Sequence, residues 1–176
     1  MKILALLRHA KSDWGLSDKR DFDRGLNARG CKGAALIGDH IRSHGIAWDH
    51  LIASPAKRVK TTLREAKLAI EPEWQERLYL APTDVICDIV REVPDTVDTL
   101  LLAGHNPGFG DMVFELVAPG SENALFDEAR VKFPTATFAV FELDLDSWDD
   151  LTEGCGKLVH FARPRDLDPA LGPDCD

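Results

Sequence analysis

The feature that most constrains the fold is an uninterrupted apolar run at the start of the chain. Residues Ile3 to Leu7 contain no polar side chain, which is typical of a short strand buried on both faces of a parallel sheet. Arg8 and His9 follow directly. Because ligands bind beyond the carboxyl ends of the strands in open α/β sheets, this position indicates an anion site. Taken alone, an Arg-His pair is more often a surface arginine that binds a carboxylate beside an exposed histidine.

A second apolar run leads into a helix start that carries a cation. Leu51 to Ala53 is followed by Ser54 and Pro55, which we expect to be the N-cap and the first residue of a helix. Arg58 then lies in the first turn, at the positive end of the helix dipole. The lysines on either side of it are expected to be solvated. This segment therefore predicts a second basic group beyond a strand end.

A third apolar run, Thr99 to Ala103, ends in the sequence Gly104-His105-Asn106-Pro107-Gly108. Asn106 and Pro107 are expected to begin another helix, with Asn106 as a cap rather than a ligand. Right-handed crossovers in a parallel sheet would bring all three strand ends to one edge. The side chains that would meet there are Arg8, His9, Arg58 and His105. Two guanidiniums beside two helix N-termini favour a phosphate group as the ligand.

The remaining periodicities complete the predicted fold. Apolar spacing predicts helices at 27–45 and 84–93, and alternation predicts strands at 136–145 and 157–163. The charged stretch from Trp14 to Gly25 predicts a loop that forms a wall or lid of the site, whereas no periodicity explains Pro119 to Pro134. Together these patterns indicate an α/β fold of three layers, with a mostly parallel central sheet and helices on both faces.

The composition narrows the classes to which this chain can belong. With 176 residues, 44% hydrophobic and 29% charged, it is long enough for one soluble globular domain with a substantial core. No internal repeat or linker divides it, which predicts a single domain over residues 1–165 and a loosely held tail over 166–176. A net charge of −9 argues against nucleic acid or an anionic membrane as the main partner. No signal peptide or membrane span is evident, so we expect a cytoplasmic protein.

Potential metal ligands are scattered or incomplete in the sequence. The four cysteines form no C-x-x-C pair and have no histidine close by in sequence, which argues against a zinc or redox motif. His40 and His44 lie four residues apart on a predicted helix, which is the spacing of a two-histidine metal pair. The H-E-x-x-H pattern and a third ligand are missing, so we expect a solvated helix face, and neither a metal nor a cofactor.

Three motifs together resemble those of the histidine phosphatase superfamily, which has a phosphoglycerate mutase-like fold. They are Arg8-His9-Ala10-Lys11-Ser12, Ser54-Pro55-Ala56 with Arg58 and Thr62, and Gly104-His105-Asn106-Pro107. The opening RHAKS and the sequence GHNP are most similar to the SixA-like phosphohistidine phosphatase branch. Ala10 stands where the superfamily's RHG motif usually has Gly, as is common in this branch. The resemblance extends from Met1 to about Leu145.

The resemblance implies a metal-independent phosphatase, with His9 as the nucleophile that forms a covalent phosphohistidine. Arg8, Arg58 and His105 would bind the phosphoryl group and stabilise its charge in the transition state. The hydroxyl of Ser12 would add a hydrogen bond to the phosphate. The arginines would also disfavour the imidazolium form of His9 and keep it reactive near neutral pH.

The substrate class depends on a residue that differs from most of the superfamily. Relatives that hydrolyse phosphate esters usually place a Glu after a pattern like Arg77-Leu78-Tyr79, and Leu80 stands there in this chain. Because an alkoxide needs a proton to leave and a protonated phosphoramidate does not, Leu80 favours phosphohistidine on a protein. Glu76 or Asp84 would be the remaining candidate acids. The alternatives are a phosphatase of small phosphate esters and a non-catalytic module that binds phosphorylated partners, whose sequence mark would be loss of His9.

Overall fold

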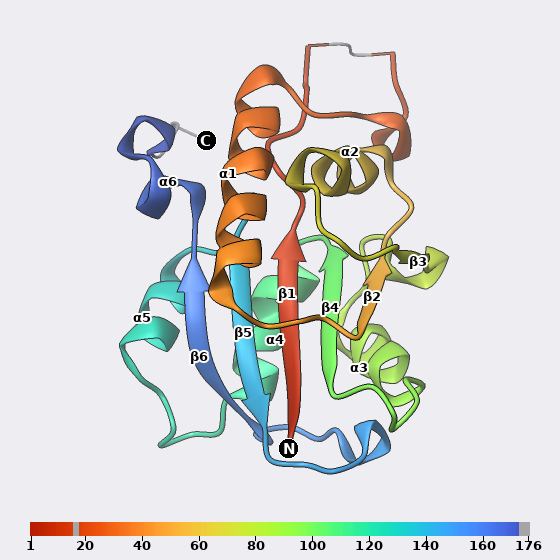
Figure 1. Cartoon of the computed structure of the whole chain (residues 1–176), viewed down its shortest axis with the longest axis vertical. Helices are drawn as coiled ribbons and strands as arrows, with labels where there is room; N and C mark the ends of the chain where they lie inside the picture. The colour runs from red at the N-terminus through yellow and green to blue at the C-terminus, as the bar shows by residue number, and fades with distance from the viewer. Residues whose placement is uncertain (16–17, 173–176) are drawn as a thin grey trace.

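The computed structural model describes residues 1–15 and 18–172, which form an α/β sandwich of three layers (Figure 1). The central sheet has the strand order β3-β2-β4-β1-β5-β6. β1, β2, β3 and β4 are mutually parallel, while β5 is antiparallel to both β1 and β6. The strand bounds are β1 Lys2–Arg8, β2 His50–Ala53, β3 Glu73–Trp74, β4 Thr99–Gly104, β5 Phe138–Leu143 and β6 Gly156–Ala162. The predicted mostly parallel sheet is confirmed.

Helices cover both faces of this sheet, as the sequence predicts. One face carries α1 (Ala28–His44) and α2 (Lys57–Ala66), with α6 (Pro164–Leu167) beside them. The other face carries α3 (Thr83–Arg91), α4 (Gly108–Leu116) and α5 (Ala124–Val131). Short 3-10 helices span Asp21–Asp23, Glu76–Leu78, Trp148–Asp150 and Pro169–Leu171. Within the described ranges, every helix is too short or too polar to cross a membrane.

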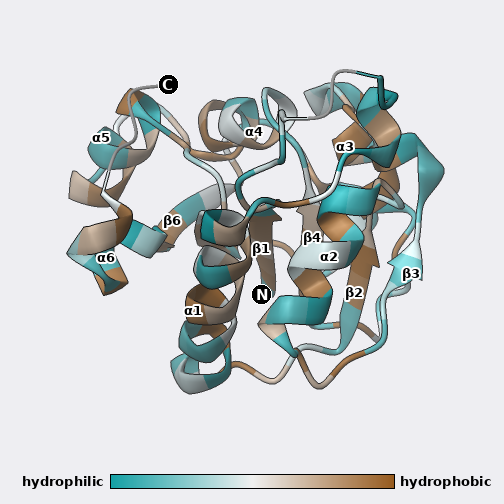
Figure 2. Ribbon diagram, turned by 90° about the horizontal axis from the view of Figure 1, so that it is seen from above, coloured by the Kyte–Doolittle hydropathy of each residue, from teal (hydrophilic) through white to brown (hydrophobic). Residues whose placement is uncertain are grey.

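β1 is the central strand because its apolar run supplies both hydrophobic cores. Leu4 and Leu6 pack with α3, α4 and α5, while Ala5 and Leu7 pack with α1 and α2. All four side chains are fully buried, as expected for alternate residues of a strand that is covered on both faces. Figure 2, which looks onto the strand ends, shows hydrophobic strands between helices whose hydrophilic sides face outward.

The register of the parallel strands brings the three predicted strand ends together. Arg8 of β1 lies opposite Gly104 of β4, and Ala53 of β2 lies opposite Ala103 of the same strand. The backbone N–H of His9 donates to the carbonyl of Gly104 at 3.0 Å, which continues the pairing beyond β1. The segments that follow β1, β2 and β4 therefore leave the sheet at a single edge, as predicted.

Three local expectations need correction. The second helix does not begin at Pro55, because its N-cap is Ala56. The hydroxyl of Ser54 accepts from the N–H of Ala56 and also contacts a ring nitrogen of His105. The helix after the third strand begins at Gly108, one residue later than expected. The unexplained stretch from Pro119 to Pro134 contains α5, whose N-cap Asn123 accepts a hydrogen bond from the next turn.

The first turn of α1 packs closely against the segment that follows β1. A Cβ on Gly30 would lie 2.1 Å from the carbonyl oxygen of Lys11, so only glycine permits this approach. Arg29 on the same turn donates to the carbonyl of Gly172 at 2.5 Å, and Lys32 forms an ion pair with Asp168 at 3.3 Å. These contacts join α1 to the part of the expected C-terminal tail up to residue 172, and residues 173–176 lie outside the described residues.

Candidate active site

A cavity of about 210 Å³ lies at the edge of the sheet where β1, β2 and β4 end. Its lining combines the predicted motif residues with residues from the loop that follows β1. The lining residues are Arg8, His9, Lys11, Ser12, Trp14, Asp21, Arg58, Leu80, Asn106 and Thr135. Four of the five predicted site residues therefore line the cavity, and the fifth, His105, lies behind them.

His9 is held in a single orientation at the wall of this cavity. Its Nδ1 lies 2.7 Å from the carbonyl oxygen of Ala10, and a carbonyl only accepts, so Nδ1 carries the hydrogen. The lone pair of the neutral ring is then on Nε2. Burial is the largest effect and lowers the pKa of His9 to about 3. The hydrogen bond with the Ala10 carbonyl raises this pKa, and the charges of Arg8, His105 and Arg58 lower it further. Burial, rather than the arginines as predicted, is the main cause of a neutral imidazole.

Thr62 fixes the backbone that carries His9. Its hydroxyl accepts from the N–H of Ala10 at 2.9 Å and donates to the carbonyl of Arg58 at 2.7 Å. The side chain is buried, so these bonds form without competition from water. One hydroxyl therefore links the segment after β1 to the first turn of α2, which explains how the two basic motifs keep a fixed separation.

The guanidinium of Arg58 is buried and binds Asp21, which the sequence analysis did not predict. Nη1 donates to the backbone carbonyl of Asp21 at 2.8 Å and Nη2 to its Oδ2 at 3.0 Å. The hydroxyl of Tyr79 donates to the same carboxylate oxygen. Burial raises the pKa of Asp21, but the hydrogen bond from Tyr79 and the charge of Arg58 outweigh it and lower that pKa overall. An ionised carboxylate therefore neutralises part of the positive charge of Arg58.

The loop expected at 14–25 does form one wall of the cavity. Trp14 and Asp21 both contribute to the lining, and the ring of Trp14 stacks on the guanidinium of Arg24 at 3.9 Å. Residues 16 and 17, and with them part of the predicted lid, lie outside the described residues.

His105 is buried behind the cavity wall, close to His9. The two ring centroids are 5.4 Å apart, and Nε2 of His105 lies 2.7 Å from the hydroxyl oxygen of Ser54. Its Nδ1 is buried and has no hydrogen-bond partner among the described residues. Burial, then the charge of Arg58, lowers the pKa of His105 to about 3. The ring is therefore neutral, and its unbonded Nδ1 can form a hydrogen bond with a ligand.

Arg8 and Ser12 lie where the motif predicts. Nη1 of Arg8 donates to the carbonyl of Phe133 at 2.9 Å, and the amide of Asn106 donates to the same oxygen at 2.9 Å. Ser12 is buried and lines the cavity. Oδ1 of Asn106 also accepts from the N–H of Gly110 in the first turn of α4, but the N-cap of that helix is Pro107 and not Asn106 as predicted. The backbone at Phe133, which follows the unpredicted helix α5, thus holds the side chains of Arg8 and Asn106 in place.

The predicted alternatives for a general acid are not in the cavity. Glu76 and Asp84 are exposed and do not contribute to its lining. Asp84 lies in the first turn of α3, and its carboxylate accepts from the N–H of Val85. Leu80 does line the cavity, with a left-handed φ of 50° and a side chain that is half exposed. Within the described residues, Asp21 is the single carboxylate in the lining, and its lowered pKa makes it a poor acid.

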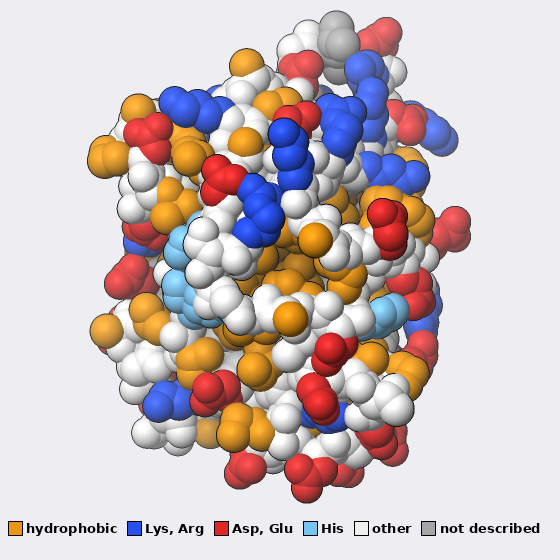
Figure 3. Space-filling model, viewed as in Figure 1, with side chains coloured by type: hydrophobic (Ala, Val, Ile, Leu, Met, Phe, Trp, Pro, Cys, Tyr) orange, Lys and Arg blue, Asp and Glu red, His pale blue; other side chains and the backbone are white. Residues whose placement is uncertain are grey.

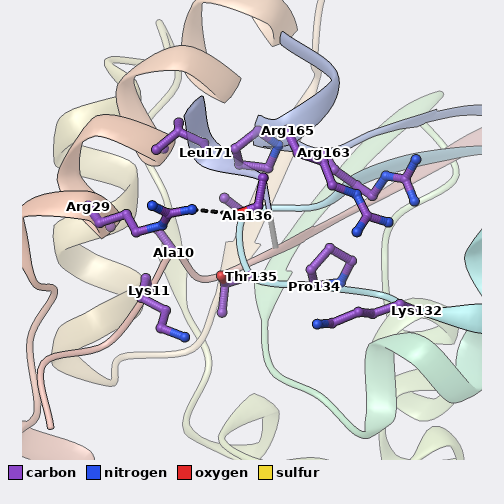
Figure 4. A pocket seen from close by; sticks show the side chains of 14 residues that line it. Ala10, Lys11, Arg29, Lys132, Pro134, Thr135, Ala136, Arg163, Arg165 and Leu171 are labelled. Atoms are coloured by element: carbon purple, nitrogen blue, oxygen red, sulfur yellow. Dashed lines mark hydrogen bonds between the residues drawn. The ribbon is translucent and has the colours of Figure 1, made fainter. Parts of the chain in front are cut away.

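A second, smaller pocket adjoins the cavity and is lined by five basic side chains, of which Arg163 is paired with Glu128 and Asp166 (Figure 4). It shares Lys11 and Thr135 with the cavity. Its other cationic lining residues are Arg29, Lys132, Arg163 and Arg165. Figure 3 shows Lys and Arg side chains concentrated toward the strand-end half of one face, with Asp and Glu more frequent at the opposite end. An acidic protein thus presents a local basic surface beside its candidate active site.

Comparisons with known proteins agree with this geometry. The family model of the histidine phosphatase superfamily (branch 1) matches residues 4–85. An uncharacterised protein of Mycobacterium tuberculosis is 34% identical over 162 residues, covering 90% of this chain and 100% of the relative. The chain belongs to the histidine phosphatase superfamily.

Solved structures place this histidine phosphatase within the superfamily. A protein assigned as the phosphohistidine phosphatase SixA of Nakamurella multipartitia has a TM-score of 0.82 and 30% identity, covering 93% of this chain and 96% of that one. A SixA assignment from Agrobacterium tumefaciens gives a TM-score of 0.76 and 26% identity over 93% of this chain and 98% of that one. The protein is thus a phosphatase of the SixA-like branch, with the phosphoglycerate mutase-like fold.

Proposed function

We propose that this phosphatase removes the phosphoryl group from phosphohistidine on a protein, with His9 as its nucleophile. The observation that carries the proposal is the fixed, neutral imidazole of His9 in a cavity lined by Arg8 and Arg58. Its Nε2 lone pair is free to attack phosphorus, whereas Nδ1 is engaged by Ala10. The SixA assignments of the solved relatives support the same substrate class.

The reaction has two displacements at phosphorus. Nε2 of His9 forms a P–N bond while the P–N bond of the substrate breaks, and the protonated substrate ring leaves as neutral imidazole. Water then attacks the phosphoryl group on His9, releases inorganic phosphate and returns the nitrogen lone pair. Arg8, Arg58 and His105 stabilise negative charge on the equatorial oxygens in both steps, which is the main catalytic task in phosphoryl transfer.

Arg58 must exchange partners in this mechanism. Its guanidinium binds Asp21 at 3.0 Å in the free protein, and phosphate oxygens would share or replace that contact. A bidentate phosphate contact is favourable enough to compete with one half-exposed carboxylate. The ionised Asp21 also disfavours a dianionic group placed against it, so the phosphoryl group is expected on the Arg8 and Ser12 side of the cavity.

The apolar Leu80 explains why a phosphoramidate is the preferred substrate. The leaving group of a phosphate ester is an alkoxide, which needs a proton from an acid. The carboxylate of Asp21, which lines the cavity, stays ionised and cannot supply that proton. A phosphohistidine carries its own proton on the leaving ring. The adjacent basic pocket supports a macromolecular substrate, since acidic side chains near a phosphohistidine would complement the pocket's charge and a small phosphorylated molecule would not reach it.

The decisive experiment compares wild type with His9→Ala on a phosphohistidine protein and on alkyl phosphomonoesters, with a chelator present. Wild type should hydrolyse phosphohistidine with a far higher kcat/KM than the esters, and His9→Ala should be inactive on both. Quenching a reaction with labelled phosphodonor should trap an acid-labile, base-stable label on wild type only.

Three outcomes would contradict the proposal in different ways. A clear preference for esters would identify a phosphatase of small phosphorylated molecules. Binding of the phosphoprotein without turnover or label would identify a non-catalytic module. Loss of activity with chelator, restored by added metal, would show that the phosphatase depends on a metal.

A further inference from the structure

Three imidazoles from two distant parts of the chain meet outside the active site. His40 and His44 lie on the last turns of α1, and His160 lies on the edge strand β6. The ring centroid of His160 is 5.0 Å from that of His40 and 4.2 Å from that of His44. One ring nitrogen of each residue lies within 4.8 Å of those of the other two. The third ligand that the sequence could not supply is therefore present.

The packing of α1 against the sheet places these three histidines together. The i, i+4 spacing puts His40 and His44 on one face of α1, which packs on the side of the sheet that carries His160. The ring of Phe138 lies beneath all three imidazoles, with centroids 5.8 to 6.4 Å away. Each histidine is partly exposed, and Figure 3 shows histidine side chains at the surface of this face. The cluster thus has an apolar floor and an opening to solvent.

We propose that His40, His44 and His160 bind a divalent transition-metal ion, such as Zn²⁺, as a three-histidine site. Imidazole nitrogen is a preferred ligand of zinc, copper and nickel, and three histidines leave one position of a tetrahedral ion open to water. Calcium and magnesium are not expected to bind, because they select oxygen ligands.

The rings of His40 and His160 need only a small adjustment to hold such an ion, and ring nitrogens of the cluster that are now up to 4.8 Å apart must approach by up to about 1.5 Å. Nε2 of His40 lies 2.8 Å from Nε2 of His160, where one ring donates its hydrogen to the other. In a tetrahedral site with Zn–N bonds of about 2.05 Å, two ligand nitrogens are about 3.3 Å apart. The two rings must separate by about half an ångström, and the shared hydrogen must move to the Nδ1 of its own ring. Side-chain rotation of the partly exposed imidazoles provides the separation, and proton exchange with solvent provides the change of tautomer.

This site would link elements of the fold rather than take part in phosphatase chemistry. The first turn of α1 contacts Lys11 beside the active-site cavity, whereas His40 and His44 follow Gly30 by ten and fourteen residues. At 1.5 Å per residue they lie about 15 to 20 Å further along the helix. A bound ion would tie the end of α1 to the edge strand β6. The proposal is therefore independent of the phosphohistidine phosphatase assignment.

The test is zinc binding to tag-free, chelator-treated full-length protein, measured by isothermal titration calorimetry. Wild type should bind one Zn²⁺ per chain at the cluster, and His44→Ala and His160→Ala should each weaken it by more than about tenfold, since even an outer-shell change costs 10–100-fold. His50→Ala is the matched control, because His50 is a partly exposed histidine that bonds to Glu73 and lies outside the cluster. It should leave the affinity unchanged.

Two further readouts separate coordination from effects on folding. Co²⁺ should give the visible absorption of a tetrahedral nitrogen-ligated ion with wild type and with the His50→Ala and His9→Ala variants, but not with His160→Ala. Zinc should raise the melting temperature of wild type and not that of the cluster variants, whose metal-free melting is measured first. If His160→Ala fails to fold, His44→Gln serves in its place. Equal zinc affinity of wild type and both cluster variants, or no binding by any protein, would overturn the proposal and leave the cluster as packing around Phe138.

Discussion

At the level of a single side chain, Leu80 is the residue on which the proposed preference for phosphohistidine rests. It lines the cavity. The resemblance to the superfamily implies a glutamate at this position in relatives that hydrolyse esters. Leu80→Glu should increase kcat/KM for an alkyl phosphomonoester, because a positioned general acid typically contributes about 10²–10⁴-fold. Turnover of phosphohistidine should change much less, since that leaving group is already protonated. Steady-state kinetics on both substrates measures the effect.

The control for this prediction is Leu80→Gln, which has the size of glutamate and no titratable proton. Both variants keep the left-handed backbone at this position, so any strain is the same in each. A gain in ester hydrolysis that is equal for the two would contradict an acid role and point to polarity alone.

At the level of elements, the contact between α1 and α2 depends on a glycine. A Cβ on Gly38 would lie 2.2 Å from the carbonyl oxygen of Ala66 and 2.4 Å from its Cα, so Gly38→Ala must move the two helices apart. We expect a loss of about 1–3 kcal/mol in the free energy of unfolding, which exceeds the gain in helix propensity of about 1 kcal/mol. Urea denaturation of the purified variant measures it.

Gly33 provides the matched control on the same helix. A Cβ there would meet the nearest atom of Pro164 at 3.5 Å, which is ordinary van der Waals contact. Gly33→Ala should therefore leave stability unchanged or raise it by up to about 1 kcal/mol. If both variants destabilise the protein equally, the effect belongs to α1 in general and not to its contact with α2.

The sequence predicts elements well where one local pattern decides them. The apolar run of β1 and the spaced apolar residues of α1 appear at nearly the expected bounds. Helix α5 was not predicted because its pattern is short and lies among acidic residues, although Asn123 is a recognisable N-cap. Asp21 and the partner of Ser54 were not predictable, because each depends on a tertiary contact over more than thirty-five residues of sequence.

At the level of the whole molecule, charge is distributed unevenly in a way that bears on substrate binding. The protein has a net charge of −9, yet a basic pocket adjoins the cavity of its candidate active site. Lys132→Glu should raise KM for a phosphohistidine protein by about two- to fivefold, as expected for a rim charge worth about 0.5–1 kcal/mol, and the effect should shrink with salt. KM for a small phosphoramidate should stay the same.

Lys157→Glu is the control for the change in net charge. Lys157 is exposed near the start of β6, at the end of the sheet opposite the cavity. An equal rise in KM for both variants would show that overall repulsion, and not the pocket, weakens substrate binding.

The two buried histidines of the candidate active site also make the stability of the whole molecule depend on pH. Burial lowers the pKa values of His9 and His105 to about 3, whereas both titrate near 6.5 in the unfolded chain. Between pH 6.5 and 3 the unfolded state therefore binds more protons, and the free energy of unfolding falls as the pH falls. Each histidine adds a slope of up to about 1.4 kcal/mol per pH unit in that window.

His9→Gln removes one of these two contributions and so isolates it. Urea unfolding of wild type and His9→Gln should be compared between pH 7 and 5, a range that lies above the titration of most carboxylates. The stability of wild type should fall more steeply with acid, and the difference in stability between the two proteins should change by about 1–2 kcal/mol across the range. Parallel curves would mean that His9 titrates alike in the folded and unfolded states, and the neutral, buried nucleophile would then lose its physical basis.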